Sequence, residues 1–301
     1  MTALVTLFCS MKPFAGHNGI IQNNALNTWK RLPGARVILL GDAPGSAEAA
    51  RERGFLHIPD IALSEYGTPL LSAMFNAAQA AADTSFVCYI NGDIVLPVDF
   101  AAKVRDISER FEKFLMVGER WDVDISESLS FENGACDTAE LLRRYEGKRH
   151  EPTGIDYFAF PTRMIDYMPD FRIGRPGWDN WLIWETKRRG IPVVDASAVL
   201  TVLHQNHDYH HVPGGNGRGW SGSPEAAQNY DILKAYPGFN PLHGTIFHAT
   251  YRLTSTGIRS GLASRRLAWD VKWILTRAYE KLRQICRFVM GGSNSRKHNS
   301  L

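Results

Sequence analysis

An Asn-Gly-Asp step at residues 91–93 separates two apolar runs, residues 86–90 and 94–96. On an extended backbone, residues two apart project to the same side, so Asn91 and Asp93 can face one ligand while Gly92 lets the chain bend. Carboxylate and carboxamide oxygens are hard ligands that suit Mg²⁺ or Mn²⁺. The step is also common turn chemistry, but here such a turn would lie inside a buried sheet. It therefore predicts a cation site that also receives a diphosphate.

A histidine cluster, His204, His207, His210 and His211, offers nitrogen ligands later in the chain. Four imidazoles so close together cannot all be core, because each buried ring needs partners for its polar atoms. Neutral imidazole binds ions such as Mn²⁺ well. A zinc site is the rival interpretation, but it would lack cysteines and an H-E-x-x-H helix. A solvated polar loop is the plain alternative.

A Pro-Gly turn at residues 176–177 would deliver Trp178, Asp179 and Asn180 to the start of a helix. Asp179 could cap that helix, but a carboxylate is also suited to general-base catalysis. Trp178 beside it offers a flat apolar face for a sugar ring. Asp156, earlier in the chain, could orient donor or acceptor hydroxyls. These residues form a candidate acceptor side.

The elements that must position these residues alternate between strand and helix. Apolar runs at residues 3–9, 35–40 and 85–96 predict strands, and residues 18–31, 46–53 and 68–82 predict helices. This alternation predicts an α/β fold with a mostly parallel sheet. Ligands of such sheets bind beyond the carboxyl ends of the strands, where Ser10, Asp42 and Asp93 each fall.

The order of these motifs resembles the GT-A fold family of nucleotide-sugar-dependent glycosyltransferases, in particular bacterial members that build glycans or lipopolysaccharide. The break at residues 91–93 looks like the Asp-x-Asp motif of that family, with Asn91 in place of the first Asp. The resemblance covers roughly residues 1–245 and implies a Rossmann-type mixed sheet flanked by helices. Residues 1–96 would bind the nucleotide sugar and residues 97–245 the acceptor.

The resemblance implies that Asp93 is the principal ligand of a Mn²⁺ or Mg²⁺ ion that bridges both phosphates of the donor. A histidine would complete the ligand set, with His207 favoured over His204. Asn91 would contact the metal more weakly or touch the ribose.

The resemblance also places Asp42 against the base or ribose, with Ser10 and Lys12 near the nucleotide. In an inverting enzyme Asp179 would accept the proton of the attacking hydroxyl, whereas in a retaining enzyme it would only position the acceptor. Asp156, Trp178 and Asn180 would contact the acceptor.

The expected reaction moves a hexosyl or related sugar from a nucleoside diphosphate donor, in our expectation a UDP-sugar, to a glycan or lipid-linked acceptor in polysaccharide biosynthesis. A sugar-nucleotide pyrophosphorylase is one alternative, but residues 10–14 lack the Gly-rich basic loop that usually follows its first strand. A non-catalytic carbohydrate-binding peripheral membrane protein is the other, and it would not need Asp93 and His207 to converge.

Positive charge is concentrated at the C-terminal end of the chain. Residues 251–301 hold 11 Lys or Arg against 2 Asp or Glu, which leaves the first 250 residues at −6 although the whole chain is +3. The acidic body argues against nucleic-acid binding. Apolar residues recur at helical spacing through residues 261–290, flanked by Trp269 and Trp273. We assign residues 246–301 to a basic amphipathic tail that either lies on an anionic membrane surface or packs on its own domain.

The four cysteines are scattered without a C-x-x-C pair, which favours a reducing compartment. The N-terminal apolar run is cut short by Lys12 and Pro13, unlike a secretory signal, and no apolar segment reaches the roughly 18 residues that span a bilayer. We expect a cytoplasmic protein that also associates with the inner face of the membrane.

Overall fold

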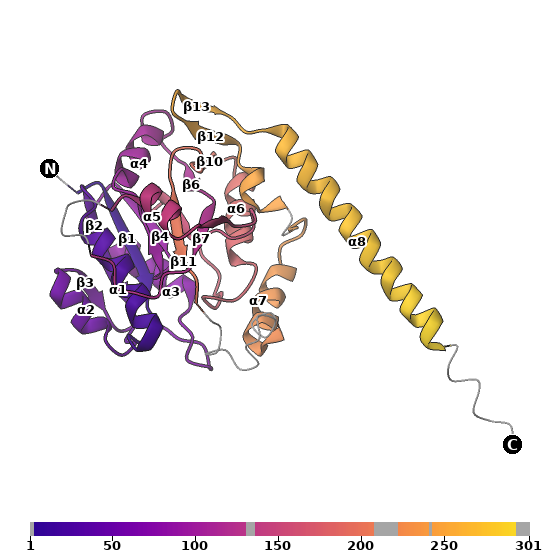
Figure 1. Cartoon of the computed structure of the whole chain (residues 1–301), viewed down its shortest axis with the longest axis horizontal. Helices are drawn as coiled ribbons and strands as arrows, with labels where there is room; N and C mark the ends of the chain where they lie inside the picture. The colour runs from indigo at the N-terminus through magenta and orange to yellow at the C-terminus, as the bar shows by residue number, and fades with distance from the viewer. Residues whose placement is uncertain (1–2, 131–135, 208–221, 241–242, 293–301) are drawn as a thin grey trace, which may run out of the picture. The chain divides into compact units, whose positions relative to one another are not determined.

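A computed structural model describes residues 3–130, 136–207, 222–240 and 243–292. The chain divides into two compact units, Met1–Gly261 and Leu262–Leu301. The first unit contains two sheets with helices around them, and the second contains one long helix (Figure 1). The predicted α/β class is confirmed.

The main sheet has nine strands in the order β13-β12-β10-β6-β9-β4-β1-β2-β3. All of them run parallel except β9 and β13, so the predicted mostly parallel sheet is confirmed. Its strands are β1 (Val5–Ser10), β2 (Ala35–Leu40), β3 (Leu56–Ile58), β4 (Phe86–Ile90), β6 (Leu115–Val117), β9 (Tyr157–Pro161), β10 (Val193–Asp195), β12 (Tyr251–Thr254) and β13 (Gly257–Ser260).

Both faces of this sheet are buried, which explains why its strands read as nearly continuous apolar runs. In β1, Leu7 and Phe8 point to opposite faces and belong to two separate hydrophobic clusters. The helices that cover the Leu7 face are α1 (Gly16–Lys30), α2 (Ser46–Arg53) and α4 (Phe100–Ser108). Those that cover the Phe8 face are α3 (Leu71–Ala81), α6 (Trp178–Arg188) and α7 (Pro224–Lys234).

A second, smaller sheet has four strands in the order β5-β11-β7-β8. Its strands are β5 (Ile94–Val95), β11 (Val202–Gln205), β7 (Arg120–Val123) and β8 (Lys148–Arg149). Helix α5 (Thr138–Arg144) packs against this sheet, where a third hydrophobic cluster is buried. The pairing of β5 with β11 places His204 opposite Ile94. The small sheet thereby brings His204 beside the break at residues 91–93.

The predicted strand at residues 85–96 is in fact two strands in two different sheets. Residues 86–90 pair with β1 and β9 in the main sheet, whereas residues 94–95 pair with β11 in the small sheet. The polar step between them is the point where the chain leaves one sheet for the other. This transfer explains how turn chemistry can lie between two buried strands.

Two other boundaries differ from those expected. Helix α3 begins at Leu71 rather than residue 68, because Pro69 and Leu70 form β-bridges with Leu63 and Arg172. The first unit extends to Gly261 rather than residue 245, because the hairpin of β12 and β13 joins the main sheet beside β10. A short 3₁₀ helix, η3 (Ile246–His248), precedes this hairpin.

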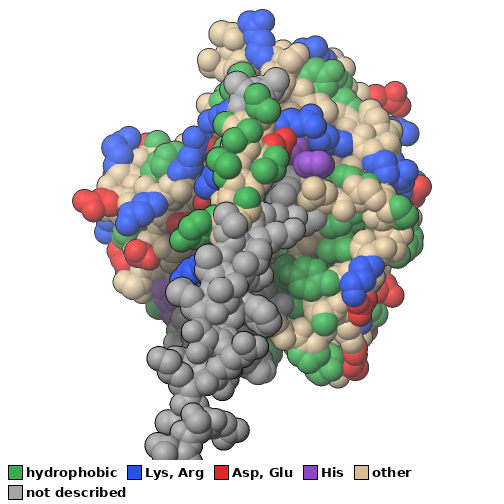
Figure 2. All heavy atoms as spheres, turned by 90° about the vertical axis from the view of Figure 1, so that its right-hand side faces the viewer, with side chains coloured by type: hydrophobic (Ala, Val, Ile, Leu, Met, Phe, Trp, Pro, Cys, Tyr) green, Lys and Arg blue, Asp and Glu red, His purple; other side chains and the backbone are tan. Residues whose placement is uncertain are grey.

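The second unit consists of α8 (Ala263–Gly292), whose 30 residues correspond to a length of about 45 Å. Large apolar side chains of α8 are exposed, and they reach the surface beside basic ones (Figure 2). Within the described part of the chain, none of the helices combines the length and apolar character needed to cross a bilayer. The predicted C-terminal amphipathic helix is confirmed.

Candidate functional site

The site lies at the carboxyl edge of the main sheet, where the order of the strands reverses. From β1 the chain continues to β2 and β3 on one side, and β4 then pairs with the other side of β1. Open parallel sheets bind ligands at this kind of switch point. Ser10 ends β1, and residues 91–93 follow directly after β4. The topology alone therefore predicts a ligand site at this edge of the sheet.

Asp93, His204 and His207 converge there. The Oδ2 atom of Asp93 lies 3.1 Å from Nε2 of His207 and 3.7 Å from Nε2 of His204. One potential ligand atom from each residue falls within 4.8 Å of those of the other two. The other carboxylate oxygen of Asp93, Oδ1, is buried and has no hydrogen-bond partner. A buried carboxylate oxygen is costly to leave unpaired, so this atom is suited to binding an ion.

The charges around Asp93 counteract the effect of burial on its pKa. Burial alone would raise the pKa of Asp93, but His204, His207 and Lys12 outweigh it and hold the pKa well below its usual range. Burial would likewise lower the pKa of His204, yet the carboxylates of Asp93 and Asp122 raise it above its ordinary value. Asp93 is therefore ionised at neutral pH, as a metal-binding carboxylate must be.

Gln205 holds the two halves of this site together. Its buried Nε2 donates to the backbone oxygens of Asp93 (2.9 Å) and Ile21 (2.8 Å). Its Oε1 accepts a hydrogen bond from Nδ2 of Asn24 at 2.9 Å. These bonds tie β11 to the break after β4 and to α1. No spacing signal in the sequence marked Gln205, because its partners come from distant segments.

Lys12 lies beside the metal-binding residues. Its Nζ is 3.4 Å from Nε2 of His207, and its backbone N–H and C=O both bond to the side chain of Gln22. The loop after β4 approaches this segment closely, since a Cβ added to Gly92 would lie 2.9 Å from Sδ of Met11. Glycine at position 92 thus permits the two loops to pack, and Lys12 places a cation where an anionic ligand would enter.

Asn91 does not share the environment of Asp93. Its Oδ1 accepts a hydrogen bond from the Tyr89 hydroxyl at 2.7 Å, and its Nδ2 donates to Oδ1 of Asp156 at 2.6 Å. Both polar atoms of Asn91 thus have a partner within the protein, and its expected contact with a metal or ribose stays a prediction. The backbone turns at residues 92–93 instead of staying extended, so the two side chains diverge.

Asp156 is also fully engaged. It is buried, and its second oxygen accepts a hydrogen bond from an Arg120 N–H at 2.7 Å. Arg120 comes from β7 and also donates through Nε to Asp122 at 2.9 Å. Asp156 therefore belongs to a largely buried ion-pair network, and its expected role toward donor or acceptor hydroxyls stays a prediction.

Asp179 has the pKa of a proton acceptor that works near neutrality. Burial raises the pKa of its carboxyl group to about 6, and the Asp156 charge adds to this effect. Backbone N–H groups at the start of α6 offset part of the rise. Burial raises the pKa of the Tyr89 phenol, and Asp156, Asp93 and Asp179 add to this effect, so all three carboxylates lie within electrostatic reach of one side chain.

The turn before α6 requires glycine. Gly177 has a φ of +97°, in the left-handed region, and a Cβ added there would lie 2.5 Å from Cδ1 of Leu233. This turn sets the position of Asp179 in the first turn of the helix. Asn180, next in the chain, donates from Nδ2 to the backbone oxygen of Gly244 at 3.0 Å, so it anchors α6 rather than facing an acceptor.

Trp178 is a core residue. It is only 5% exposed and packs against the rings of Tyr89 and Phe158, with centroid distances of 4.9 and 5.1 Å. Its face is therefore not open to a sugar ring, contrary to our expectation. The side chain instead buttresses the segment that carries Asp179.

The remaining predicted residues that the structure describes occupy the same edge of the main sheet. Ser10 is half-buried at the end of β1, and Asp42 is exposed after the end of the adjacent β2. His210 and His211 lie outside the described residues. Asp122, which sequence analysis did not identify, lies next to His204 in the small sheet, and His150, also not identified, contacts Asp122.

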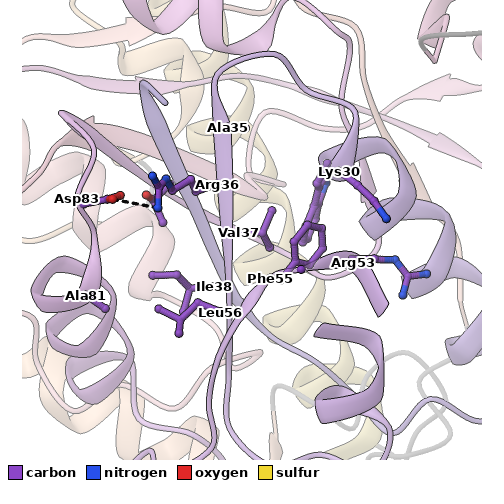
Figure 3. A pocket seen from close by; sticks show the side chains of 13 residues that line it. Lys30, Ala35, Arg36, Val37, Ile38, Arg53, Phe55, Leu56, Ala81 and Asp83 are labelled. Atoms are coloured by element: carbon purple, nitrogen blue, oxygen red, sulfur yellow. Dashed lines mark ion pairs between the residues drawn. The ribbon is translucent and has the colours of Figure 1, made fainter. Parts of the chain in front are cut away.

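A separate hollow of about 450 Å³ lies at the other end of β2 (Figure 3). Lys30, Arg36, Arg53, Phe55 and Asp83 are among its lining residues, and Arg36 pairs with Asp83 at 2.9 Å. None of the residues predicted for the functional site lines it. The hollow is near the amino end of β2, whereas the metal-binding residues are at the carboxyl edge.

Comparison with protein-family models and with curated proteins gives no match. Among solved structures, a mannosyltransferase from Pyrobaculum calidifontis in complex with GDP-Man and Mn²⁺ is 12% identical, with 82% of this chain and 69% of that chain covered and a TM-score of 0.47. Glucosyl-3-phosphoglycerate synthase from Mycobacterium tuberculosis, in complex with Mg²⁺ and UDP, is 14% identical, with coverages of 79% and 80% and a TM-score of 0.43.

TarS from S. aureus in complex with UDP is 11% identical, with 45% of this chain covered and a TM-score of 0.31. The match spans only 38% of that TarS chain. At this distance, the assignment of function depends on the side chains of the protein itself.

Proposed function

We propose that this protein is a metal-assisted glycosyltransferase that uses a nucleoside diphosphate sugar as donor. One observation carries the proposal: Asp93, His204 and His207 converge at the strand-order switch point, with Oδ1 of Asp93 buried and unpaired. Nζ of Lys12 lies 3.4 Å from Nε2 of His207. A carboxylate, two imidazoles and an ammonium group at a switch point suit a divalent ion together with a diphosphate.

Asp93, His204 and His207 would hold Mn²⁺ or Mg²⁺ through oxygen and ring nitrogen. What the bound ion supplies is neutralisation of the negative charge that develops on the departing diphosphate. Lys12 would add a positive charge to the phosphates from the β1 side. The mixed oxygen and nitrogen set favours Mn²⁺ over Mg²⁺, because Mg²⁺ prefers oxygen ligands.

Asp179 would act on the acceptor. In an inverting transfer its carboxylate takes the proton of the acceptor hydroxyl, while that oxygen bonds to the anomeric carbon and the bond to the diphosphate breaks. A pKa near 6 leaves the group ionised at neutral pH yet basic enough to accept a proton. In a retaining transfer the same carboxylate would only orient the acceptor. We expect a UDP-sugar as donor and a glycan or lipid-linked acceptor.

A thermal-shift panel tests the donor site. Nucleoside diphosphates and their sugars are titrated with and without Mn²⁺ against the wild type, Asp93→Ala and the control Asp106→Ala. Asp106 is a partly exposed residue of α4 that pairs with Lys103. Because a ligand raises stability by RT ln(1 + [L]/Kd), the true donor should raise the melting temperature of the wild type and the control in a Mn²⁺-dependent way. Failure of every nucleotide, or an Asp93→Ala response equal to that of the wild type, would refute the proposal.

We also propose that α8 binds an anionic membrane surface and thereby brings the enzyme to a lipid-linked acceptor. Leu267, Val271, Ile274 and Leu275 are exposed and share one stripe of the helix by their spacing. Lys272 and other basic residues flank this stripe. Apolar stripes bordered by basic side chains and tryptophan suit the interface of an anionic bilayer.

Flotation with vesicles tests this second proposal. The wild type should float with vesicles of mixed phosphatidylcholine and phosphatidylglycerol but not with phosphatidylcholine alone, and added salt should weaken the binding. Ile274→Glu should abolish flotation, whereas Thr276→Glu, an equal charge change at an exposed position outside the stripe, should largely retain it. If the wild type does not bind anionic vesicles, the surviving explanation is that α8 packs on its own domain.

A further inference from the structure

The ring of His204 lies between two carboxylates. Its Nε2 is 3.7 Å from Oδ2 of Asp93, and its Nδ1 is 3.3 Å from Oδ1 of Asp122, a close approach that lacks the alignment of a hydrogen bond. A carboxylate can only accept hydrogen bonds, so the nitrogen that faces Asp122 must carry the hydrogen when the ring is neutral and Nε2 binds an ion. Histidine ligands of metals are commonly oriented in this way by a carboxylate behind them.

We propose that Asp122 is a positioning residue that fixes the ring orientation and tautomer of His204, so that Nε2 is presented to the ion held with Asp93. The inference rests on the proposed function, because it assigns Asp122 a role only if His204 is a ligand. Asp122 does not itself reach the ion.

Strand pairing supports this role. Asp122 in β7 and His204 in β11 are partners in the parallel register of the small sheet, so the backbone sets their side chains next to each other. Asp122 is held in turn by two further groups: Oδ1 accepts a hydrogen bond from Nε of Arg120 at 2.9 Å, and Oδ2 lies 2.6 Å from Nδ1 of His150. A carboxylate held by these two groups can keep the imidazole in one orientation.

Arg120 joins this support to the one beneath Asp93. The same guanidinium that bonds to Asp122 also bonds to Asp156, and Asp156 bonds to Asn91 in the break that carries Asp93. The guanidinium of Arg120 therefore supports both the break that carries Asp93 and the strand that pairs with His204.

Mn²⁺ binding, measured by the electron paramagnetic resonance signal of the free ion, tests the inference without any activity assay. Asp122→Asn keeps the size of the side chain but can turn an amide N–H toward His204. It should weaken Mn²⁺ binding by about 10–100-fold. Asp106→Asn, the matched exposed control, should bind as the wild type does. Circular dichroism and the melting temperature verify that each variant is folded.

A second measurement reads the tautomer of His204 in the wild type itself. The ¹⁵N chemical shifts of the His204 ring, assigned by comparison with His204→Gln, report its tautomer in the metal-free wild type at a pH where the ring is neutral. We expect hydrogen on Nδ1, and in Asp122→Asn a shift toward hydrogen on Nε2. Hydrogen on Nε2 in the wild type, or unchanged Mn²⁺ affinity in a folded Asp122→Asn, would overturn the inference.

The outcomes separate this inference from the proposed function. If the wild type takes up no Mn²⁺, both are refuted. If the wild type binds Mn²⁺, Asp93→Ala does not, and Asp122→Asn matches the wild type, then the metal site stands and only the role of Asp122 falls.

Discussion

Asn91 and Asp93 are two residues apart in one motif, yet the structure gives them opposite surroundings. Asn91 has a partner for both of its polar atoms, as does Asp156 next to it. Asp93 is more buried than Asn91, yet Oδ1 has no hydrogen-bond partner and Oδ2 faces two imidazoles. A polar cluster that satisfies itself is part of the scaffold, whereas a buried polar atom left unpaired indicates a place for a ligand. The comparison divides the predicted residues into those that support the site and those that act in it.

The largest effect is expected at Asp179, the acting carboxylate on the acceptor side. Asp179→Asn removes the proton acceptor, so kcat should fall by about 10²–10⁴-fold if the enzyme inverts configuration. Steady-state transfer assays with the donor found in the thermal-shift panel measure this loss, with Asp106→Asn as the control. A variant that keeps more than a tenth of the wild-type rate would remove Asp179 from the proton-transfer step.

The same substitution should stabilise the fold. The folded pKa of Asp179 is raised to about 6 from 3.8, so between these values the folded state binds more protons than the unfolded state. Its contribution to stability therefore falls as pH rises through this window, and the penalty is complete above pH 6. Replacing the carboxylate by an amide should raise the free energy of unfolding at pH 7.5 by on the order of 1–3 kcal/mol, as urea denaturation would measure. A destabilised Asp179→Asn would contradict the cost assigned to this buried charge.

Asp156 should behave in the opposite way, as a supporting residue. Asp156→Asn breaks a buried ion pair with Arg120 and should lower the free energy of unfolding by about 3 kcal/mol, since Asp122 remains as a second partner of the guanidinium. Provided the variant is folded, Mn²⁺ and nucleotide should still raise its melting temperature. Asp93→Asn should lose that response. If Asp156→Asn loses the response and keeps its stability, the division between support and ligand is wrong.

The pH dependence of kcat should show a smaller effect that changes gradually. Only the ionised carboxylate of Asp179 can accept a proton, so kcat should decline by about tenfold per pH unit below the pKa of about 6. A pH profile measured at saturating Mn²⁺ and donor reports this limb. Asp179→Asn should show a flat profile in the same range, and a declining limb that persists in the variant would assign it to another group.

The smallest effect is expected at Gly177, which contributes no polar side chain at all. Alanine there must adopt a φ of +97° and meets Leu233, so Gly177→Ala should lower the free energy of unfolding by roughly 1–3 kcal/mol. Gly190→Ala is the matched control, since Gly190 also has a positive φ but an added Cβ meets no atom within 4 Å. A larger loss in the control would show that contact with Leu233 is not what restricts the turn.

The elements of the main sheet could be predicted from local pattern because its strands are buried on both faces and therefore appear as apolar runs. The same rule located Ser10, Asp42 and Asp93 at the carboxyl edge. Asp93, His204 and His207 were identifiable by residue type, since few other roles suit a carboxylate inside an apolar run or so many nearby imidazoles.

The residues that support the site could not be predicted from local sequence pattern. Asp122 and His204 are adjacent only because β7 and β11 pair, and Gln205 reaches Asn24 across the fold. Nor does sequence spacing tell whether Trp178 points inward, because an aromatic ring at a helix start suits the core and a sugar equally well. The surroundings of Asn91 were hidden for a related reason: the turn after β4 replaces the extended geometry that the sequence predicted for residues 91–93.

The transfer of the chain from one sheet to the other at residues 91–93 has a mechanical consequence. Asp93 precedes β5 and His204 lies in its partner β11, so both move as part of the small sheet, locked by Gln205. Lys12 and Asp179 are carried by the large sheet and its helices. The pairing of β5 with β11 therefore holds two of the proposed ligands in one frame, and the bonds of Gln205 to Ile21 and Asn24 couple that frame to α1 on the large sheet.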